Sequence, residues 1–369
     1  MKIAITSRFN YGFFSNGLNQ NIVLLYEILE SIGAEVCFLD FTFEENGEKF
    51  ETHEFINNKN LINWKDFKKQ KDQHIDILLC PGIAPNQDIY STIKKANPKS
   101  KICAVHYGNN LMTDMHKLYF SEKPELYAFE ETNFFDFCLY SPHYSFAKDY
   151  MSLSKECEAL ELPYIWDPKF IKKEAENAGA DLRYKPVARQ NIAVVEPCLN
   201  ISKTNFIPLL AILQLLKEKP HIFNEAYIFS NKFGKNFTQP AKHLNTQTVL
   251  RDYPERVYFD PRQKIVNIFK NDNPIILAHQ FYNELNYIYL EALYYDFPLV
   301  HNSPPFENVG YYYKEFNIRE AVTRITEAAE KHNDTLDEQR ESNRKIIDKY
   351  SLKANQSKTQ KLIERIYVD

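Results

Sequence analysis

The chain has 369 residues, and a length of this order predicts two domains at about 100–200 residues each. Hydrophobic residues make up 44% and charged residues 25%, which allows a large globular core. The formal net charge of −4 argues against nucleic acid as the main partner, because basic side chains supply most of the affinity for phosphates. None of the six cysteines lies in a CxxC or a zinc-type Cys/His spacing, so we expect buried thiols in a reducing compartment.

The N-terminal sequence MKIAITSRF reads directly as a strand and has no signal-peptide apolar region. The sequence also contains no run of 18 apolar residues, the length that a membrane-spanning helix needs. We therefore expect a cytoplasmic protein without a membrane span, and a peripheral contact with a membrane stays open.

The first part of the chain alternates strand and helix patterns. Short apolar runs predict strands at 2–6, 35–40, 75–80, 102–106 and 136–140. Helical spacing of apolar residues predicts a helix over Ile22–Ser31, with Gly33 as its C-cap. This alternation predicts a parallel sheet with helices on both faces, spanning residues 1–165.

Prolines at 163, 168 and 186 mark the middle of the chain, and we interpret the charged stretch 172–183 as linker and entry helix. The alternation then restarts, with strands predicted at 191–196, 225–230, 257–260, 274–279 and 298–302. Helices are predicted at 208–217, 265–270 and 287–295. These elements predict a second α/β domain over 186–325, followed at 326–369 by terminal helices that pack back on the body. The helical pattern itself runs from Ile318 to Val368 and predicts one or two helices.

Ligands of parallel sheets bind beyond the carboxyl ends of the strands, so the residues after each strand are the first candidates for a site. The helix that starts near Tyr287 follows the strand 274–279. Its N-terminus offers unpaired N–H groups and a positive dipole end, which suit a diphosphate. Glu291 lies one to two turns into this helix, where a carboxylate can accept both hydrogen bonds of a ribose diol.

The segment NELNYIYLEALYYDFPLVHN, residues 283–302, resembles the donor-binding segment of GT-B glycosyltransferases. Many of those families place a Glu, seven residues and a second Glu before an Ala and a Pro that opens the next strand. Glu291, Ala292 and Pro298 match this pattern, whereas Asn283 stands at the position of the first Glu. The resemblance therefore implies ribose recognition by Glu291, and it does not extend to a retaining mechanism that relies on the first Glu.

Three further segments, 107–120, 196–210 and 301–316, resemble an uncharacterised bacterial and viral glycosyltransferase-like family of GT-B type. The resemblance implies an α/β fold of two Rossmann-like domains with a cleft between them and a C-terminal helix that crosses back to the first. It also implies an acceptor-side domain at the N-terminus and a nucleotide-sugar donor domain at the C-terminus.

Several residues of the second domain are candidates for donor binding. Lys203 could neutralise the diphosphate and Glu196 could orient that lysine, or the two could be a surface lysine and a strand-end carboxylate. Asn200 could contact the ligand or cap the helix that follows. The remaining donor candidates are polar residues at strand ends or at the helix start: His279, Asn283, Asn286, Tyr287, Asn231 and Lys232. His279 could equally be a core residue, and Asn231 and Lys232 a plain polar turn.

In the first domain, a polar loop after the first strand is expected to face the donor phosphates and the acceptor. Asn16, Gly17 and Asn19 are its candidate contacts, together with Asn109 after the strand 102–106. The loop has no GxGxxG and is a poor dinucleotide fingerprint. Asp114 or His106 could act as the general base that an inverting transfer needs, although Asp114 could instead cap a helix from about Met115.

No DxD motif follows a strand end, so we expect a metal-independent reaction in which the helix dipole and basic side chains carry the diphosphate charge. We expect no cofactor beyond the nucleotide diphosphate sugar that serves as donor substrate. The predicted function is a hexosyl- or pentosyltransferase acting on a hydroxyl of a glycan or another acceptor. Two alternatives remain: a nucleotide-sugar epimerase or hydrolase, and a catalytically inactive nucleotide-sugar-binding module.

Overall fold

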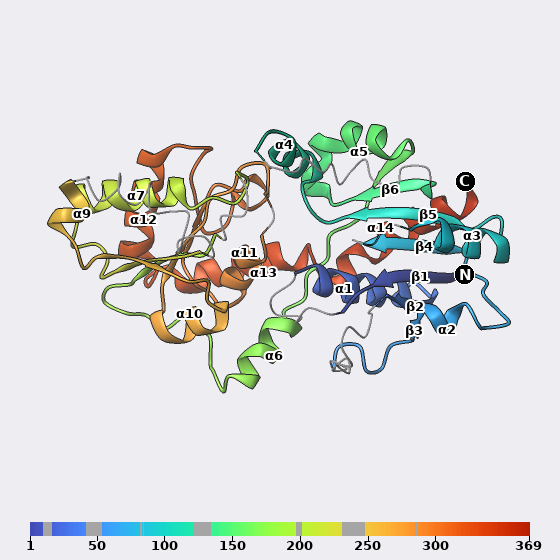
Figure 1. Cartoon of the computed structure of the whole chain (residues 1–369). Coiled ribbons are helices and arrows are strands. Elements are labelled where there is room, and N and C mark those ends of the chain that lie inside the picture. The colour runs from blue at the N-terminus through green and yellow to red at the C-terminus, as the bar shows by residue number, and fades with distance from the viewer. Residues whose placement is uncertain are drawn as a thin grey trace. The chain divides into compact units, whose positions relative to one another are not determined.

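A computed structural model describes residues 1–9, 17–41, 54–81, 83, 85–120, 134–196, 201–230, 248–284 and 286–369 of the chain. The chain forms two compact units (Figure 1), the first made of Met1–Asp167 with Tyr350–Asp369 and the second of Pro168–Lys349. Each unit has a parallel sheet of its own. The predicted α/β class with two sheets is therefore confirmed.

The first unit contains a seven-stranded parallel sheet in the order β3-β2-β1-β4-β5-β6-β7. All five predicted strands are present, and β3 and β7 are additional short strands with few apolar residues. The strands are β1 (Lys2–Ser7), β2 (Glu35–Asp40), β3 (Leu61–Asn63), β4 (Ile77–Pro81), β5 (Lys101–His106), β6 (Phe137–Tyr140) and β7 (Glu158–Glu161). β1 and β4 are almost wholly buried, as strands covered by helices on both faces are.

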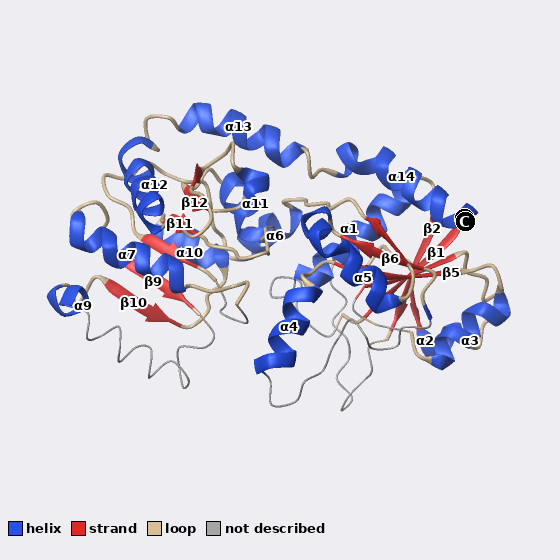
Figure 2. Ribbon diagram, turned by 90° about the horizontal axis from the view of Figure 1, so that it is seen from above, coloured by secondary structure: helices blue, strands red, loops and turns tan. Residues whose placement is uncertain are grey.

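The helices of the first unit are α1 (Gly17–Ser31), α2 (Trp64–Phe67), α3 (Gln87–Ala96), α4 (Asn110–Phe120), η3 (Pro142–Ala147), α5 (Lys148–Lys155) and α14 (Leu352–Val368). α1 ends at Ser31, as predicted, and Gly33 follows it with a φ of +84°, a conformation that glycine adopts without strain. α14, the last element of the chain, packs against α1 (Figure 2). Gln356 donates a hydrogen bond to the carbonyl of Ser31, and Arg365 forms an ion pair with Glu158 at 2.8 Å.

The second unit contains a six-stranded parallel sheet in the order β10-β9-β8-β11-β12-β13. The five predicted strands are again present, and β13 was missed because it has only two residues. The strands are β8 (Ile192–Val194), β9 (Ala226–Phe229), β10 (Val257–Asp260), β11 (Ile275–Leu277), β12 (Leu299–His301) and β13 (Tyr311–Tyr312).

The helices of the second unit are α6 (Lys169–Asn177), α7 (Phe206–Glu218), α9 (Thr248–Asp252), α10 (Ile265–Asp272), α11 (Tyr287–Tyr294), η4 (Pro304–Phe306), α12 (Ile318–Lys331) and α13 (Leu336–Asp348). α7 and α12 contribute Leu209, Ile212, Val322 and Ile325 to one hydrophobic core with the strands. The terminal stretch forms three helices, α12, α13 and α14, so the prediction of one or two was wrong. Turns near Asn333 and Ser351 interrupt the helical pattern.

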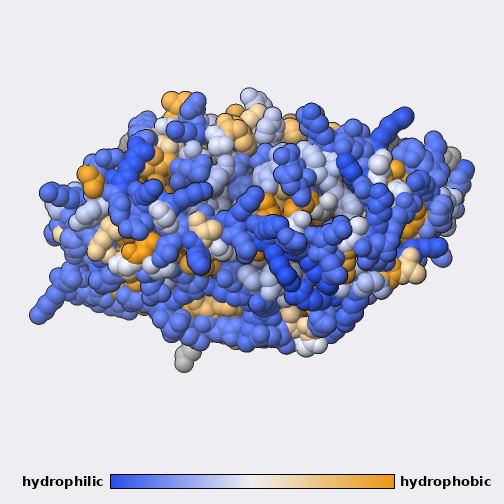
Figure 3. All heavy atoms as spheres, turned by 180° about the vertical axis from the view of Figure 1, so that it is seen from behind, coloured by the Kyte–Doolittle hydropathy of each residue, from blue (hydrophilic) through white to orange (hydrophobic). Residues whose placement is uncertain are grey.

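The surface seen in Figure 3 is largely hydrophilic, and its hydrophobic residues occur in small, separated patches. Such scattered patches are normal for a protein surface. Within the described residues, no helix combines the length and the apolar character that crossing a membrane requires.

Candidate functional site

A cluster of polar side chains lies at the carboxyl edge of the sheet in the second unit. Glu196 follows β8 and His279 follows β11, and these two strands are neighbours in the sheet. Lys203 stands between β8 and α7, and Asn286 directly precedes α11. Four of the residues that the sequence indicated, Glu196, Lys203, His279 and Asn286, therefore come from segments that follow two adjacent strands.

Glu196 is the centre of this cluster and is only 1% exposed. The Asn286 amide nitrogen lies 3.5 Å from each carboxylate oxygen, and the backbone N–H of His279 also donates to the carboxylate. Burial raises the pKa of Glu196 to about 7, against the opposing effects of Lys203 and these two donors. A buried carboxylate titrating near neutrality is a feature common at functional sites.

Lys203 interacts electrostatically with both Glu196 and Arg262. Burial lowers the pKa of the Lys203 ammonium, the Glu196 carboxylate opposes that shift, and Arg262 adds to it. Arg262 follows β10 and is exposed. Two cations that converge on one place repel each other, and a bound polyanion would relieve that repulsion. Arg262 was missed by the sequence reasoning, although the strand-end rule that selected Glu196 applies equally to the residues after β10.

His279 is fully buried beside the cluster. Its Nδ1 lies 2.9 Å from the Tyr313 hydroxyl, which in turn donates to the carbonyl of Ala278. Tyr313 therefore accepts from Nδ1–H, so the lone pair is on Nε2, which has no hydrogen-bond partner in the described part of the chain. Burial lowers the pKa of His279 to about 4, so the ring is neutral at pH 7 and Nε2 is an available acceptor.

The N-terminus of α11 adjoins the same cluster. Its N-cap residue, Asn286, makes no side-chain capping bond to the helix, because its amide is directed to Glu196 instead. Tyr287 is the first residue of the helix and is half-buried. The positive end of the helix dipole thus lies next to Lys203 and Glu196, in the arrangement that favours an anion.

Glu291 lies on α11, four residues after Tyr287, and is half-buried. The pKa of Glu291 is raised to about 8, first by burial and then by the neighbouring carboxylate of Glu174 on α6. Glu174 itself pairs with Lys264 at 3.3 Å. Glu291 makes no side-chain hydrogen bond or ion pair within the described residues, so its carboxyl group is available to a ligand. Glu174 is a second residue that the sequence reasoning missed, since no pattern links it to α11.

Asn283 is buried, and its backbone N–H donates to the side-chain oxygen of Gln280 at 2.9 Å. Gln280 is in turn held by Asn302, whose amide accepts from the Gln280 N–H at 2.8 Å and donates to its carbonyl at 2.9 Å. These bonds fix the loop after β11 against the loop after β12. Three other predicted donor residues, Asn200, Asn231 and Lys232, lie outside the described residues.

The two candidate bases lie in the first unit. Asp114 is 2% exposed and accepts a hydrogen bond from the Tyr150 hydroxyl at 2.7 Å, which ties α4 to α5. His106 ends β5, and its Nδ1 lies 2.7 Å from the Asn110 amide nitrogen. Burial and the nearby Lys155 lower the pKa of His106 to about 4, so its ring is neutral at pH 7. The alternative interpretation of Asp114 as an N-cap was wrong, because α4 already begins at Asn110.

Asn109 accepts a hydrogen bond from the backbone N–H of Met112 at 3.0 Å and so caps the start of α4. Gly17 is the first residue of α1, and Asn19 is buried within that helix. Asn16 lies outside the described residues. Among the residues that the structure describes, no three His, Cys, Asp or Glu side chains are grouped as metal ligands.

Comparison with known proteins agrees with this architecture. A glycosyltransferase from Rickettsia africae is 10% identical with a TM-score of 0.56, covering 100% of this chain and 99% of that one. The E. coli trehalose-6-phosphate protein bound with UDP-2-fluoro glucose is 14% identical with a TM-score of 0.61 and the same coverage. The pneumococcal O-GlcNAc transferase GtfA, in complex with UDP and GlcNAc, is 11% identical with a TM-score of 0.57 and again the same coverage.

At these low identities the likeness establishes the fold, which is the GT-B fold, as the sequence predicted. Comparison with proteins of curated function finds no match. A family model described as "Protein of unknown function (DUF2827)" matches residues 3–366, nearly the whole chain. The chain therefore belongs to the DUF2827 family.

Proposed function

We propose that the protein is a glycosyltransferase that moves a sugar from a nucleoside diphosphate sugar to a hydroxyl group of an acceptor. The GT-B fold over the full chain supports this proposal, because two of the similar structures contain UDP or a UDP-sugar analogue. Fold likeness does not identify chemistry by itself, so the proposal depends on the site.

The observation that carries the proposal is the cluster of the buried Glu196 with the half-buried Lys203 and Asn286 at the N-terminus of α11, with Arg262 beside it. Departure of a nucleoside diphosphate develops negative charge on the bridging phosphate oxygen. Lys203, Arg262 and the dipole of α11 would stabilise that charge without a metal ion. Glu196 would hold Lys203 in place and so acts as a positioning residue.

Glu291 would bind the ribose of the donor. Its carboxyl group lies one turn further along the same helix whose N-terminus would hold the diphosphate. The diphosphate and the ribose are neighbours in the ligand. The helix N-terminus and Glu291 are likewise neighbours on α11. Ionised Glu291 could accept both hydroxyls of the ribose, and hydrogen bonds to a charged group contribute about 1.5–3 kcal/mol each.

Of the two candidate bases, we favour His106 over Asp114. Asp114 is buried and already accepts from Tyr150, whereas His106 is neutral and only half-buried. The Asn110 amide decides which nitrogen is basic. With the Asn110 amide nitrogen facing Nδ1, that ring nitrogen accepts and Nε2 carries the proton of the neutral ring. Rotation of the Asn110 amide by 180° would place its oxygen on Nδ1–H and would free Nε2 to take the acceptor proton.

One experiment tests the proposal on the whole chain. Incubation with UDP-, GDP- and dTDP-sugars, with and without simple sugar acceptors, should release the free nucleoside diphosphate from at least one donor. Lys203→Met should reduce that release by roughly 100-fold, the scale of one lost electrostatic contact to the transition state. Lys217→Met is the matched control, because Lys217 is an exposed lysine on α7 with no ion pair in the described chain.

The competing proposal, a nucleotide-sugar-binding module without catalysis, is favoured by the engagement of Asp114 with Tyr150. Donor binding with no nucleotide release under any acceptor condition would support the module. Release of nucleotide without an acceptor, accompanied by free sugar, would instead support a hydrolase.

A further inference from the structure

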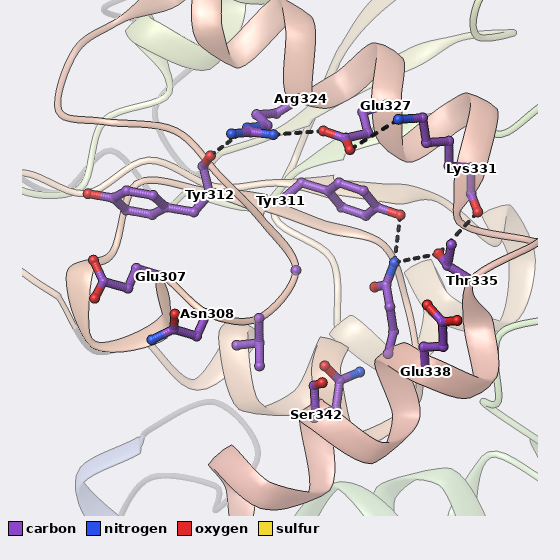
Figure 4. Close-up of a pocket in the computed structure, with 14 residues that line it drawn as sticks. Glu307, Asn308, Tyr311, Tyr312, Arg324, Glu327, Lys331, Thr335, Glu338 and Ser342 are labelled. Carbon is purple, nitrogen blue, oxygen red and sulfur yellow. Dashed lines mark hydrogen bonds and ion pairs between the residues drawn. The ribbon is translucent and has the colours of Figure 1, made fainter.

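A pocket of about 420 Å³ lies in the second unit, apart from the cluster around Glu196. The loop before β13, the helix α12 and the first half of α13 line it (Figure 4). None of the residues that the sequence indicated for donor binding lines it. Residues 307–310 precede β13 and so lie at the amino end of that strand, whereas the cluster lies at carboxyl ends. Its volume falls within the range of about 300–1,000 Å³ that is usual for small-molecule sites.

The basic side chains of this pocket are already paired. Arg324 donates to the carbonyl of Tyr312 and to Glu327 at 2.8 Å each, and Lys331 lies 3.5 Å from Glu327. Figure 4 shows these three side chains in a row along α12. Glu327 neutralises one of these two positive charges, which reduces the attraction of the row for an anionic ligand.

Three other side chains of the pocket, by contrast, keep acceptor oxygens without a partner among the described residues. Glu307 and Glu338 form no ion pair within the described chain. Asn343 is 2% exposed; its amide nitrogen donates to the carbonyl of Leu293 at 3.2 Å, while its Oδ1 has no partner among the described residues. A buried acceptor without a donor costs free energy, and a ligand donor in the pocket would remove that cost.

We infer that this pocket binds a neutral saccharide. Sugar hydroxyls would donate to Glu307, Glu338 and Asn343 Oδ1, and the half-buried ring of Tyr312 offers an apolar face to sugar C–H groups. A phosphate group would meet two unpaired carboxylates. A polyamine would be repelled by Arg324 and Lys331. It would also gain little net attraction, because two basic and three acidic side chains give the pocket a net charge of only −1. The inference is independent of the proposed transfer reaction, because the pocket shares no residue with the Glu196 cluster.

Saturation-transfer NMR on the whole chain tests this inference. The probes are glucose, galactose, mannose, N-acetylglucosamine, maltose and lactose at millimolar concentrations, with excess UDP present; spermidine and inorganic phosphate serve as charged probes. The test variant is the double substitution Glu307→Gln with Glu338→Gln, which keeps shape and removes charge. Glu330→Gln is the matched control, because Glu330 is exposed on α12 and does not line the pocket.

We expect at least one sugar to give a saturable signal that weakens roughly tenfold in the double variant and is unchanged in the control, the effect of losing charged acceptors. Both substituted residues are exposed, so the variant should unfold at the wild-type temperature. No saturable signal from any sugar, equal binding by the double variant, or displacement of the sugar by spermidine or phosphate would each overturn the inference.

Discussion

The pKa of Glu291 leads to a prediction about how nucleotide binding depends on pH. The pKa of this carboxyl group is about 8 in the unliganded protein, so only about one tenth of the molecules carry an ionised Glu291 at pH 7. If the ribose is bound only by the carboxylate, the apparent affinity equals the affinity of the ionised protein multiplied by the fraction of molecules in which Glu291 is ionised. At pH 8.5 about three quarters of the molecules are ionised. UDP should therefore bind roughly eightfold more tightly at pH 8.5 than at pH 7, a difference of about 1.2 kcal/mol.

Titration calorimetry at the two pH values measures this difference. The second ionisation of a phosphate has a pKa of about 6, so the charge of UDP changes little over this range. Glu291→Gln should bind more weakly than wild type at pH 8.5, by about 1–3 kcal/mol, and should lose the part of the pH dependence that comes from Glu291. The part that comes from Glu196, whose pKa is about 7, is common to both proteins. Glu174→Gln should move the rise in affinity to lower pH, because Glu174 is the neighbouring carboxylate that raises the pKa of Glu291.

Proton release provides a second readout of the same event. Binding at pH 7 in buffers of different ionisation enthalpy should show close to one proton released per UDP bound. A pH dependence that is equal in wild type and Glu291→Gln would refute the assignment of Glu291 to the ribose. Unchanged affinity in Glu291→Gln at pH 8.5 would refute it as well.

Three further predictions concern stability, measured by urea unfolding. The pKa of Glu196 in the folded protein is raised to about 7 from 4.5, so its contribution to stability is complete below about pH 4.5 and is lost as the pH rises through 7. This loss is at most about 3 kcal/mol, and the free energy of unfolding of Glu196→Gln should not show it. Lys203→Met should lower the free energy of unfolding by about 1–3 kcal/mol at pH 8 and by less at pH 5, where Glu196 is protonated; an equal loss at both pH values would contradict the pairing. Gly310→Ala should lower the free energy of unfolding by roughly 2–4 kcal/mol, because the residue has a φ of +63° and a Cβ would lie 2.6 Å from the carbonyl oxygen of Leu299. Gly33→Ala is the control and should cost only about 1 kcal/mol, because Gly33 has a φ of +84° but faces open space. Equal costs would show that the contact with Leu299 is not made.

The two sheets could be predicted because their strands are short apolar runs separated by helical patterns. β2 and β10 have the predicted bounds, 35–40 and 257–260. β3, β7 and β13 escaped prediction because strands of two to four residues with polar members have no detectable period. The split of the terminal stretch into three helices depends on local caps, such as Ser351 accepting from the Ala354 N–H, which charge patterns do not reveal.

The candidate site was partly accessible to the same reasoning. The rule that ligands bind beyond the carboxyl ends of strands selected Glu196 and His279, and the structure shows the side chain of one and the backbone of the other in contact. The interactions of Arg262 with Lys203 and of Glu174 with Glu291 could not be predicted, because they join elements distant in sequence. Asp114 illustrates the opposite error. The capping role considered for it was wrong, because α4 begins at Asn110 and tertiary packing pairs Asp114 with Tyr150.

The central claim is that the second unit binds the diphosphate of a nucleotide sugar through Lys203 and the N-terminus of α11. Titration calorimetry of wild type, Lys203→Met and Lys217→Met with UDP-, GDP- and dTDP-sugars tests it most directly. The account predicts that at least one nucleotide sugar binds wild type and the Lys217 variant equally, and binds the Lys203 variant at least tenfold more weakly. Binding of none of them, or equal binding by the Lys203 variant, would contradict it.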